Sequence, residues 1–69
     1  MKWALFVTEH GIRYEAEDRP QHFCKVYTFK KDNKELTYVV PYEVIGRHRP
    51  VEIENELLRV LKEVFNEYN

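Results

Sequence analysis

The 69-residue sequence is poor in residues that supply nucleophiles and covalent cross-links. It contains no serine and a single cysteine, which excludes a serine nucleophile and an internal disulfide. Small secreted domains normally depend on disulfides, so we expect the reducing cytoplasm. The apolar run Trp3–Val7 is shorter than the core of a signal peptide. A membrane span needs roughly 20 apolar residues, so we expect no membrane insertion.

Glycine and proline are also scarce, with two and three residues respectively. Hydrophobic residues make up 43% of the chain, which is typical of a folded protein rather than a disordered one. A chain of this length supports one thin core, so residues 1–69 are expected to form a single small domain. The net charge of −1 gives no long-range field that would attract polyanions.

Two segments around His10-Gly11 alternate between apolar and polar residues. If this dipeptide is a two-residue turn, directly opposed residues share a face of the resulting hairpin. One face then carries Trp3, Leu5, Val7, Ile12, Tyr14 and Ala16. The alternation therefore predicts a first hairpin with strands over residues 2–9 and 12–18.

Two further segments, 23–31 and 35–44, are rich in β-branched and aromatic residues and predict a second hairpin. A loop of two or four residues places Phe23, Tyr27 and Phe29 opposite Leu36, Tyr38 and Val40. A loop of three residues instead pairs Val26 and Thr28 with Tyr38 and Val40. We favour the first register because it gathers the large rings on one face. Pro41 cannot donate a ladder hydrogen bond, so pairing should weaken there.

The apolar spacing becomes helical after Pro50 and predicts a helix over residues 50–68. Proline suits the first helical position, and three glutamates, Glu52, Glu54 and Glu56, suit the positive end of the helix dipole. The fold expected is α+β, a four-stranded antiparallel sheet of two hairpins packed against one C-terminal helix. The expected core consists of Leu5, Val7, Tyr14, Leu57, Leu61 and Val64.

No combination of residues in the sequence indicates catalysis or metal binding. Cys24 is expected in the middle of a strand, where a buried thiol is unreactive. His22 and Cys24 offer two ligands on one side of that strand, whereas zinc requires three or four. We therefore expect a protein that is not an enzyme, with no cofactor, no metal site and no small-molecule substrate.

An excess of apolar surface favours protein binding. Leu58 and Phe65 widen the apolar arc of the C-terminal helix to roughly 180°, more than one sheet face requires. We expect both at the centre of an interface, with Arg47, His48 and Arg49 as its rim, facing an acidic patch. The function predicted is a small regulatory or inhibitory module that binds another protein or pairs with itself as a homodimer.

Single-stranded nucleic acid is the alternative partner. On this hypothesis Tyr27 and Tyr38 lie on an open sheet face and stack bases, while lysines and arginines contact phosphates. The first 50 residues carry nine basic and seven acidic side chains. This surplus is small, because typical binders of nucleic acid make about six to ten contacts with phosphates. Protein binding is therefore the favoured prediction.

Overall fold

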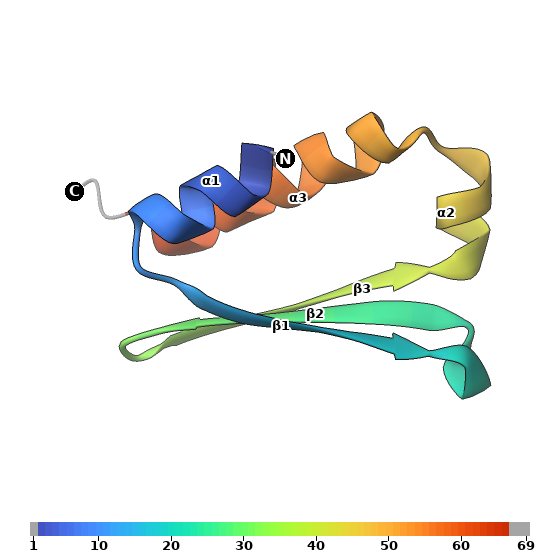
Figure 1. Cartoon of the computed structure of the whole chain (residues 1–69), viewed down its shortest axis with the longest axis horizontal. Helices are drawn as coiled ribbons and strands as arrows, with labels where there is room; N and C mark the ends of the chain where they lie inside the picture. The colour runs from blue at the N-terminus through green and yellow to red at the C-terminus, as the bar shows by residue number, and fades with distance from the viewer. Residues whose placement is uncertain (1, 67–69) are drawn as a thin grey trace.

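The computed structural model describes residues 2–66 and shows a helix, three strands and two further helices along the chain (Figure 1). The elements are α1 (Lys2–Glu9), β1 (Arg13–Arg19), β2 (Cys24–Lys31), β3 (Lys34–Pro41), α2 (Tyr42–Arg47) and α3 (Pro50–Phe65). The strands form one antiparallel sheet in the order β1-β2-β3. The α+β class is confirmed, but the expected fourth strand and single helix are wrong.

The first predicted strand is the helix α1. Trp3 and Val7 are both buried, and residues four apart share a helix face as readily as they share one side of a strand. As part of a helix, the Trp3 ring packs edge-on against three rings of the sheet, those of Tyr14, Tyr27 and Phe29. Leu5, which the hairpin placed in the core, is instead 61% exposed.

His10-Gly11 ends α1 instead of forming a hairpin turn. Gly11 has a φ of +67°, the left-handed conformation common just after a helix. The N–H of Ile12 donates to the carbonyl of Val7 at 3.0 Å, and the N–H of Gly11 donates to that of Thr8 at 3.3 Å. Ile12 and Val7 both belong to the core, which supplies the hydrophobic contact that accompanies such a helix end.

The second hairpin has the favoured register. A two-residue loop joins β2 to β3, and Tyr27 lies opposite Tyr38 while Phe29 lies opposite Leu36. Phe23 was expected in this strand, but it follows the 3₁₀ turn Pro20–His22, has a φ of 55° and is 72% exposed.

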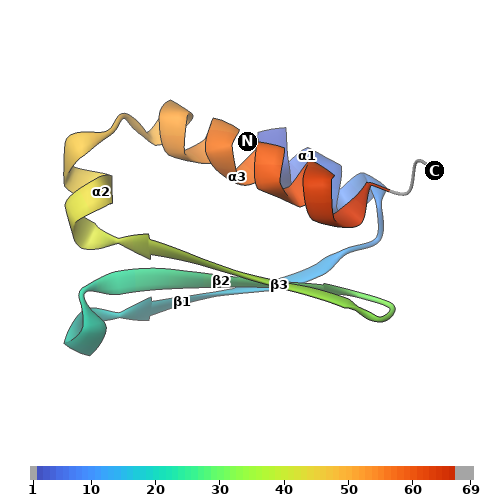
Figure 2. The same cartoon turned by 180° about the vertical axis from the view of Figure 1, so that it is seen from behind.

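Helices α1 and α3 lie side by side on one face of the sheet, α1 toward β1 and α3 toward β3 (Figures 1 and 2). The buried cluster between the layers consists of Trp3, Val7, Ile12, Phe29, Leu57, Leu61 and Phe65. Three predicted core residues, Val7, Leu57 and Leu61, are buried, and Val64 packs against them. Tyr14 is 47% exposed, so its assignment to the core is wrong. Within residues 2–66, no helix has the length and apolar character needed to cross a membrane.

The chain between β3 and α3 departs from the prediction. Pro41 ends β3 and caps the short helix α2, so residues 42–44 are helical and not part of a strand. The helix α3 begins at Pro50 as predicted, and the Glu52 carboxylate accepts a hydrogen bond from the N–H of Arg49 at 3.0 Å. The predicted end of this helix at residue 68 lies outside the described residues.

Two leucines test the packing of the helices. Leu61 is fully buried, so Leu61→Ala should lower the free energy of unfolding by about 2–5 kcal/mol. The control is Leu5→Ala, which should cost less than about 0.5 kcal/mol because Leu5 is largely exposed. Urea denaturation followed by circular dichroism measures both values. If the two substitutions cost similar amounts, Leu5 would have to be buried, which would contradict the helical structure of residues 2–9.

Two glycines test the end of α1. A Cβ at Gly11 or Gly46 would meet no atom within 4 Å, but only Gly11 has a positive φ. Gly11→Ala should therefore destabilise the protein by about 1–2 kcal/mol. Gly46→Ala lies within α2 and should stabilise it by about 0.4–1 kcal/mol. Thermal denaturation separates these opposite signs, and a stabilising Gly11→Ala would disprove the proposed helix end.

Candidate functional site

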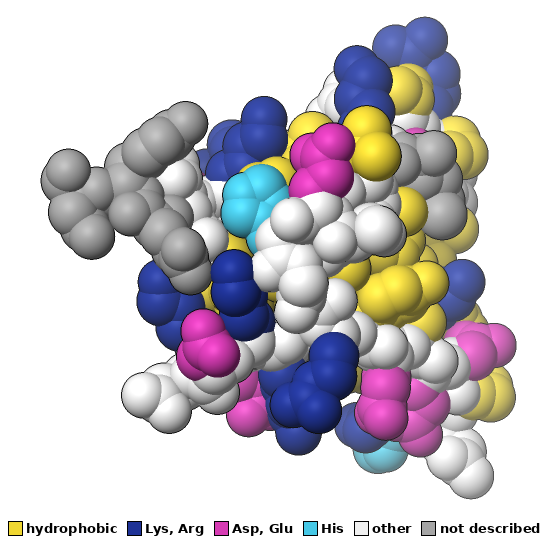
Figure 3. Space-filling model, turned by 60° about the vertical axis from the view of Figure 1, so that its left-hand side comes forward, with side chains coloured by type: hydrophobic (Ala, Val, Ile, Leu, Met, Phe, Trp, Pro, Cys, Tyr) yellow, Lys and Arg dark blue, Asp and Glu magenta, His cyan; other side chains and the backbone are white. Residues whose placement is uncertain are grey.

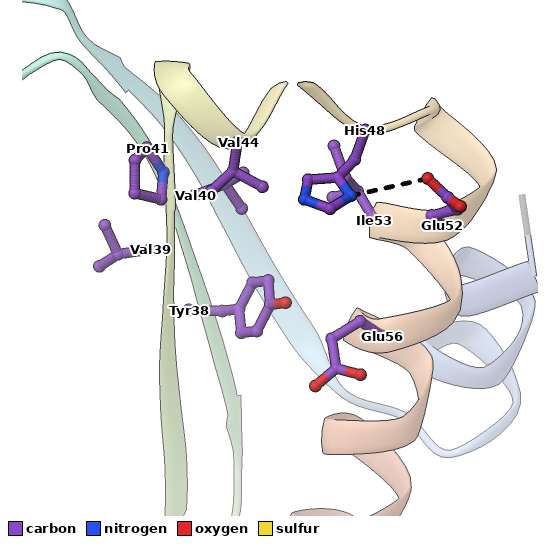
Figure 4. A pocket seen from close by; sticks show the side chains of 9 residues that line it. All are labelled: Tyr38, Val39, Val40, Pro41, Val44, His48, Glu52, Ile53 and Glu56. Carbon is purple, nitrogen blue, oxygen red and sulfur yellow. Dashed lines mark ion pairs between the residues drawn. The ribbon is translucent and has the colours of Figure 1, made fainter. Parts of the chain in front are cut away.

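A pocket of about 320 Å³ opens between β3 and α3, at the end of the molecule where α2 connects the two layers (Figures 1 and 4). The residues that line it are Tyr38, Val39, Val40, Pro41, Val44, His48, Glu52, Ile53 and Glu56. Val40, Val44 and Ile53 provide apolar surface, while the two glutamates lie along the α3 wall (Figure 4). The pocket therefore joins an apolar interior to an acidic rim.

Local sequence explains how these side chains meet. Tyr38 and Val40 alternate along β3 and so point toward α3, whereas Val39 points to the other side of the strand (Figure 4). Glu52 and Glu56 are four residues apart in α3 and share one face of that helix. Because Pro41 turns the chain into α2, Val44 forms the end wall of the pocket.

The charges of the rim are partly paired. Arg59 donates to both oxygens of Glu56 at 3.1 and 2.6 Å, and this hydrogen bonding lowers the pKa of Glu56. The same guanidinium also donates to Glu63 at 2.8 Å. Burial raises the pKa of Tyr38, and the charge of Glu56 raises it further, so Tyr38 stays a neutral phenol. The rim thus presents the ionised carboxylate of Glu56 beside the neutral hydroxyl group of Tyr38.

The titratable groups of the pocket remain open to water. The side chains of Glu52 and Glu56 are each 49% exposed, and that of His48 is 55% exposed. Acid–base catalysis usually requires a site that excludes water. Across residues 2–66, no group of three histidine, cysteine or acidic side chains is placed to hold a metal ion. The charged groups of the pocket are therefore accessible to anything that approaches from solvent.

The pocket lies beside a free sheet edge. Among the described residues, no further strand pairs with the outer side of β3. Half of its backbone N–H and C=O groups therefore point away from the sheet. Residues 36–40 of this edge carry no charge.

The opposite edge, β1, differs in chemistry. All seven of its residues are exposed, and five are charged: Arg13, Glu15, Glu17, Asp18 and Arg19. Charged edge strands resist the addition of another strand. β3 is therefore the edge of this sheet that is open to pairing.

The predicted basic cluster lies beside the pocket, and one member lines it. Arg47 approaches Glu43 at 3.7 Å, and Arg49 approaches Glu52 at 3.8 Å, with both arginines strongly exposed. His48 lies 3.7 Å from Glu52 and borders the pocket (Figure 4). All three are ion pairs between exposed side chains, and such pairs contribute little to stability.

The predicted interface on α3 is wrong in part. Phe65 is 1% exposed and belongs to the core, so it is unavailable to a partner. Leu58 is half-buried and packs against the same cluster. The wide apolar arc of α3 is covered within the molecule, because α3 packs against both the sheet and α1.

The two tyrosines do not lie on the open sheet face, which corrects that expectation. Tyr27 packs against Trp3 at 5.9 Å between ring centroids, and Tyr38 packs against the core cluster. Both therefore face the helices. The opposite face of β2 and β3 carries smaller residues, with Val26 paired to Val39 and Thr28 paired to Thr37.

A smaller hollow of about 170 Å³ lies on the other side of the Val40–Ile53 contact. Val40 and Ile53 line both the pocket and this hollow, and so lie between them. The lining of the hollow also includes Lys25 and Glu54. On the side of α1 and β1, hydrophobic side chains are visible between the helix layer and the charged edge (Figure 3). The smaller hollow is lined by one charge of each sign, Lys25 and Glu54, unlike the acidic rim of the larger pocket.

Sequence analysis missed most of the pocket. Glu52 and Glu56 were assigned to the helix dipole, although their spacing of four residues was a signal that they share a face. Val44 was missed because α2 was predicted as strand. Val40 and Ile53 meet only through tertiary packing, for which the sequence has no local signal.

Tyr42 fastens the end wall of the pocket. Its N–H donates to the carbonyl of Phe23 at 2.8 Å, and its hydroxyl donates to the Asp18 carboxylate. The hydrogen bond to Asp18 is the main cause that raises the pKa of Tyr42 to about 12. Through these two bonds, α2 is tied to the corner between β1 and β2.

The raised pKa of Tyr42 predicts a pH effect on stability. Its ordinary value is 10.0, so the stabilisation from the Asp18 bond should be complete below pH 10.0 and lost as the pH rises toward about 12. Tyr42→Phe should lack this contribution at every pH. Urea denaturation at pH 8 and pH 11 should therefore show a smaller decrease for Tyr42→Phe than for the wild type. Equal decreases would show that Tyr42 does not donate this bond.

Comparison with known proteins leaves the chain without an assigned family. Neither the protein-family models, the curated proteins nor the solved structures give a match to this sequence or fold. The features that bear on its function are therefore the pocket between β3 and α3 and the adjoining edge of β3.

Proposed function

We propose that this protein binds an extended segment of another protein, which adds as a fourth strand at the outer edge of β3. The observation that carries this proposal is the position of the uncharged edge directly beside the pocket. In strand addition, backbone hydrogen bonds supply affinity and pockets for alternate side chains supply specificity. Both requirements are met at β3 by residues that belong to the same surface.

The spacing of a sheet defines where the bound segment would lie. A neighbouring strand sits about 4.8 Å away, and its side chains alternate between the two faces. Side chains on the helix-facing side would enter the pocket against Val40, Val44 and Ile53. Those on the other side would lie beside Val39, which is 52% exposed.

A lone segment fits this edge better than a second copy of the chain. α3 and β3 lie on the same side of the molecule in both views (Figures 1 and 2). Pairing two β3 strands edge to edge would bring two α3 helices toward a separation of one strand spacing, about 5 Å. Packed helices require about 8–10 Å between their axes. A homodimer through β3 is therefore disfavoured by the helix layer.

This mode of binding suits a regulatory or inhibitory role in the cytoplasm. While a segment of the target is bound at β3, it cannot pair with another sheet, so the binding would inhibit that other interaction. The contact is limited to one strand and one pocket, so its area falls in the range of transient complexes. We expect a dissociation constant of about 1 μM, equivalent to about −8 kcal/mol.

Selection from a library of phage-displayed random heptapeptides tests the proposal. Enriched sequences should alternate apolar residues, and a synthetic peptide should shift the amide resonances of residues 36–40 and of the first half of α3. Val39→Lys places a charge on the edge and should weaken binding about tenfold. The matched control is Ala16→Lys on the edge of β1, which should change the affinity less than twofold.

Several outcomes would contradict strand addition at β3. These are the absence of enriched peptides, equal weakening by the two lysine variants, and resonance shifts confined to β1. Sedimentation at increasing protein concentration checks the alternative occupant, since a dimer that Val39→Lys dissociates would identify the second copy as the partner.

A further inference from the structure

We propose that the bound segment carries a lysine or arginine at the position facing α3, between apolar neighbours. This inference rests on the proposed function and names the chemistry of its partner. The pocket has an apolar interior formed by Val40, Val44 and Ile53 and an acidic rim formed by Glu52 and Glu56. A long cationic side chain matches both parts, because its aliphatic stem covers apolar surface while its charged end stays in water.

The charges along α3 leave the rim negative. Its 16 residues include four glutamates, at 52, 54, 56 and 63, but only Arg59 and Lys62 as cations. Arg59 is shared between Glu56 and Glu63, so one guanidinium faces two carboxylates. This sharing leaves excess negative charge beside the pocket, which an incoming cation would reduce.

Glu52 has weaker partners than Glu56. One of its oxygens accepts the backbone N–H of Arg49, and that residue's guanidinium lies 3.8 Å away, beyond hydrogen-bonding distance. The Arg49 side chain is 79% exposed, so water screens its charge. His48 lies 3.7 Å away and is a counter-ion only when protonated. An incoming ammonium or guanidinium group therefore finds a carboxylate to which no side chain within residues 2–66 donates a hydrogen bond.

The hollow on the other side of α3 provides an internal comparison. It shares Val40 and Ile53 with the pocket, but its charged residues are Lys25 and Glu54, one of each sign. The preference for a cation therefore belongs to the β3 side of the helix. Electrostatic complementarity of this kind sets which partners bind, even where it adds little affinity.

Three fluorescein-labelled peptides of sequence Thr-Val-Thr-Xaa-Thr-Val-Thr, with lysine, methionine or glutamate at Xaa, test the inference. In an added strand, both valines and Xaa share the face toward α3. Fluorescence anisotropy at low salt should rank affinity as lysine, methionine, then glutamate, with about a tenfold difference between the charged peptides. At about 0.5 M salt the difference should fall to roughly threefold or less.

Two double variants with the same change in net charge locate the effect. Glu52→Gln with Glu56→Gln removes the rim and should abolish the preference for lysine over glutamate. Glu9→Gln with Glu54→Gln should keep the preference, because neither residue lines the pocket or is hydrogen-bonded to Arg59. Circular dichroism checks that both variants are folded.

The outcomes separate this inference from the proposed function. Equal binding of all three peptides, or equal loss of the preference in both double variants, would overturn the cationic partner but leave strand addition standing. No binding of any peptide at millimolar concentration would overturn strand addition, and the cationic partner with it.

Discussion

The packing of Trp3 against the sheet is the contact on which the architecture depends. Its ring meets those of Tyr14, Tyr27 and Phe29, and so fixes α1 over the side of the sheet that α3 leaves bare. Because α1 has only eight residues, this cover ends partway along the strands. Both helices cover the sheet at one end, and at the other end only α3 continues toward α2 (Figure 1). The core cluster therefore lies under both helices, whereas the pocket is lined by β3, α2, His48 and α3 alone.

The two edge strands of the sheet, β1 and β3, both have unpaired backbone groups but differ in the charge of their side chains. A three-stranded sheet has two free edges, and both are exposed to unwanted pairing. β1 is protected by five charged side chains along seven residues. β3 has charges only at Lys34 and Glu35, near the hairpin loop, and none in the part that borders the pocket. The sheet therefore has one charged edge and one edge that is uncharged beside the pocket, which is the asymmetry on which the proposed strand addition rests.

The sequence predicted the parts of the fold whose patterns have one interpretation. Helical spacing after Pro50 located α3, and the grouping of large rings selected the register of β2 and β3. The segment over residues 2–9 failed because Trp3 and Val7 fit either a helix face or one side of a strand. α2 has six residues, too few to show a period. Of the pocket, only Tyr38 and His48 were singled out, because its apolar residues come from elements that meet through tertiary packing.

Pro41 links the fold to the site more closely than any other residue. Without an N–H, it ends the pairing of β3, and as the cap of α2 it directs the chain from the sheet layer toward the helix layer. Tyr42, the next residue, then ties this turn to Phe23 and Asp18. The end wall of the groove is therefore held by the covalent path and by hydrogen bonds within the chain. A pocket held in this way is formed by the chain itself, so the binding proposed for it would not need to supply the free energy to order it.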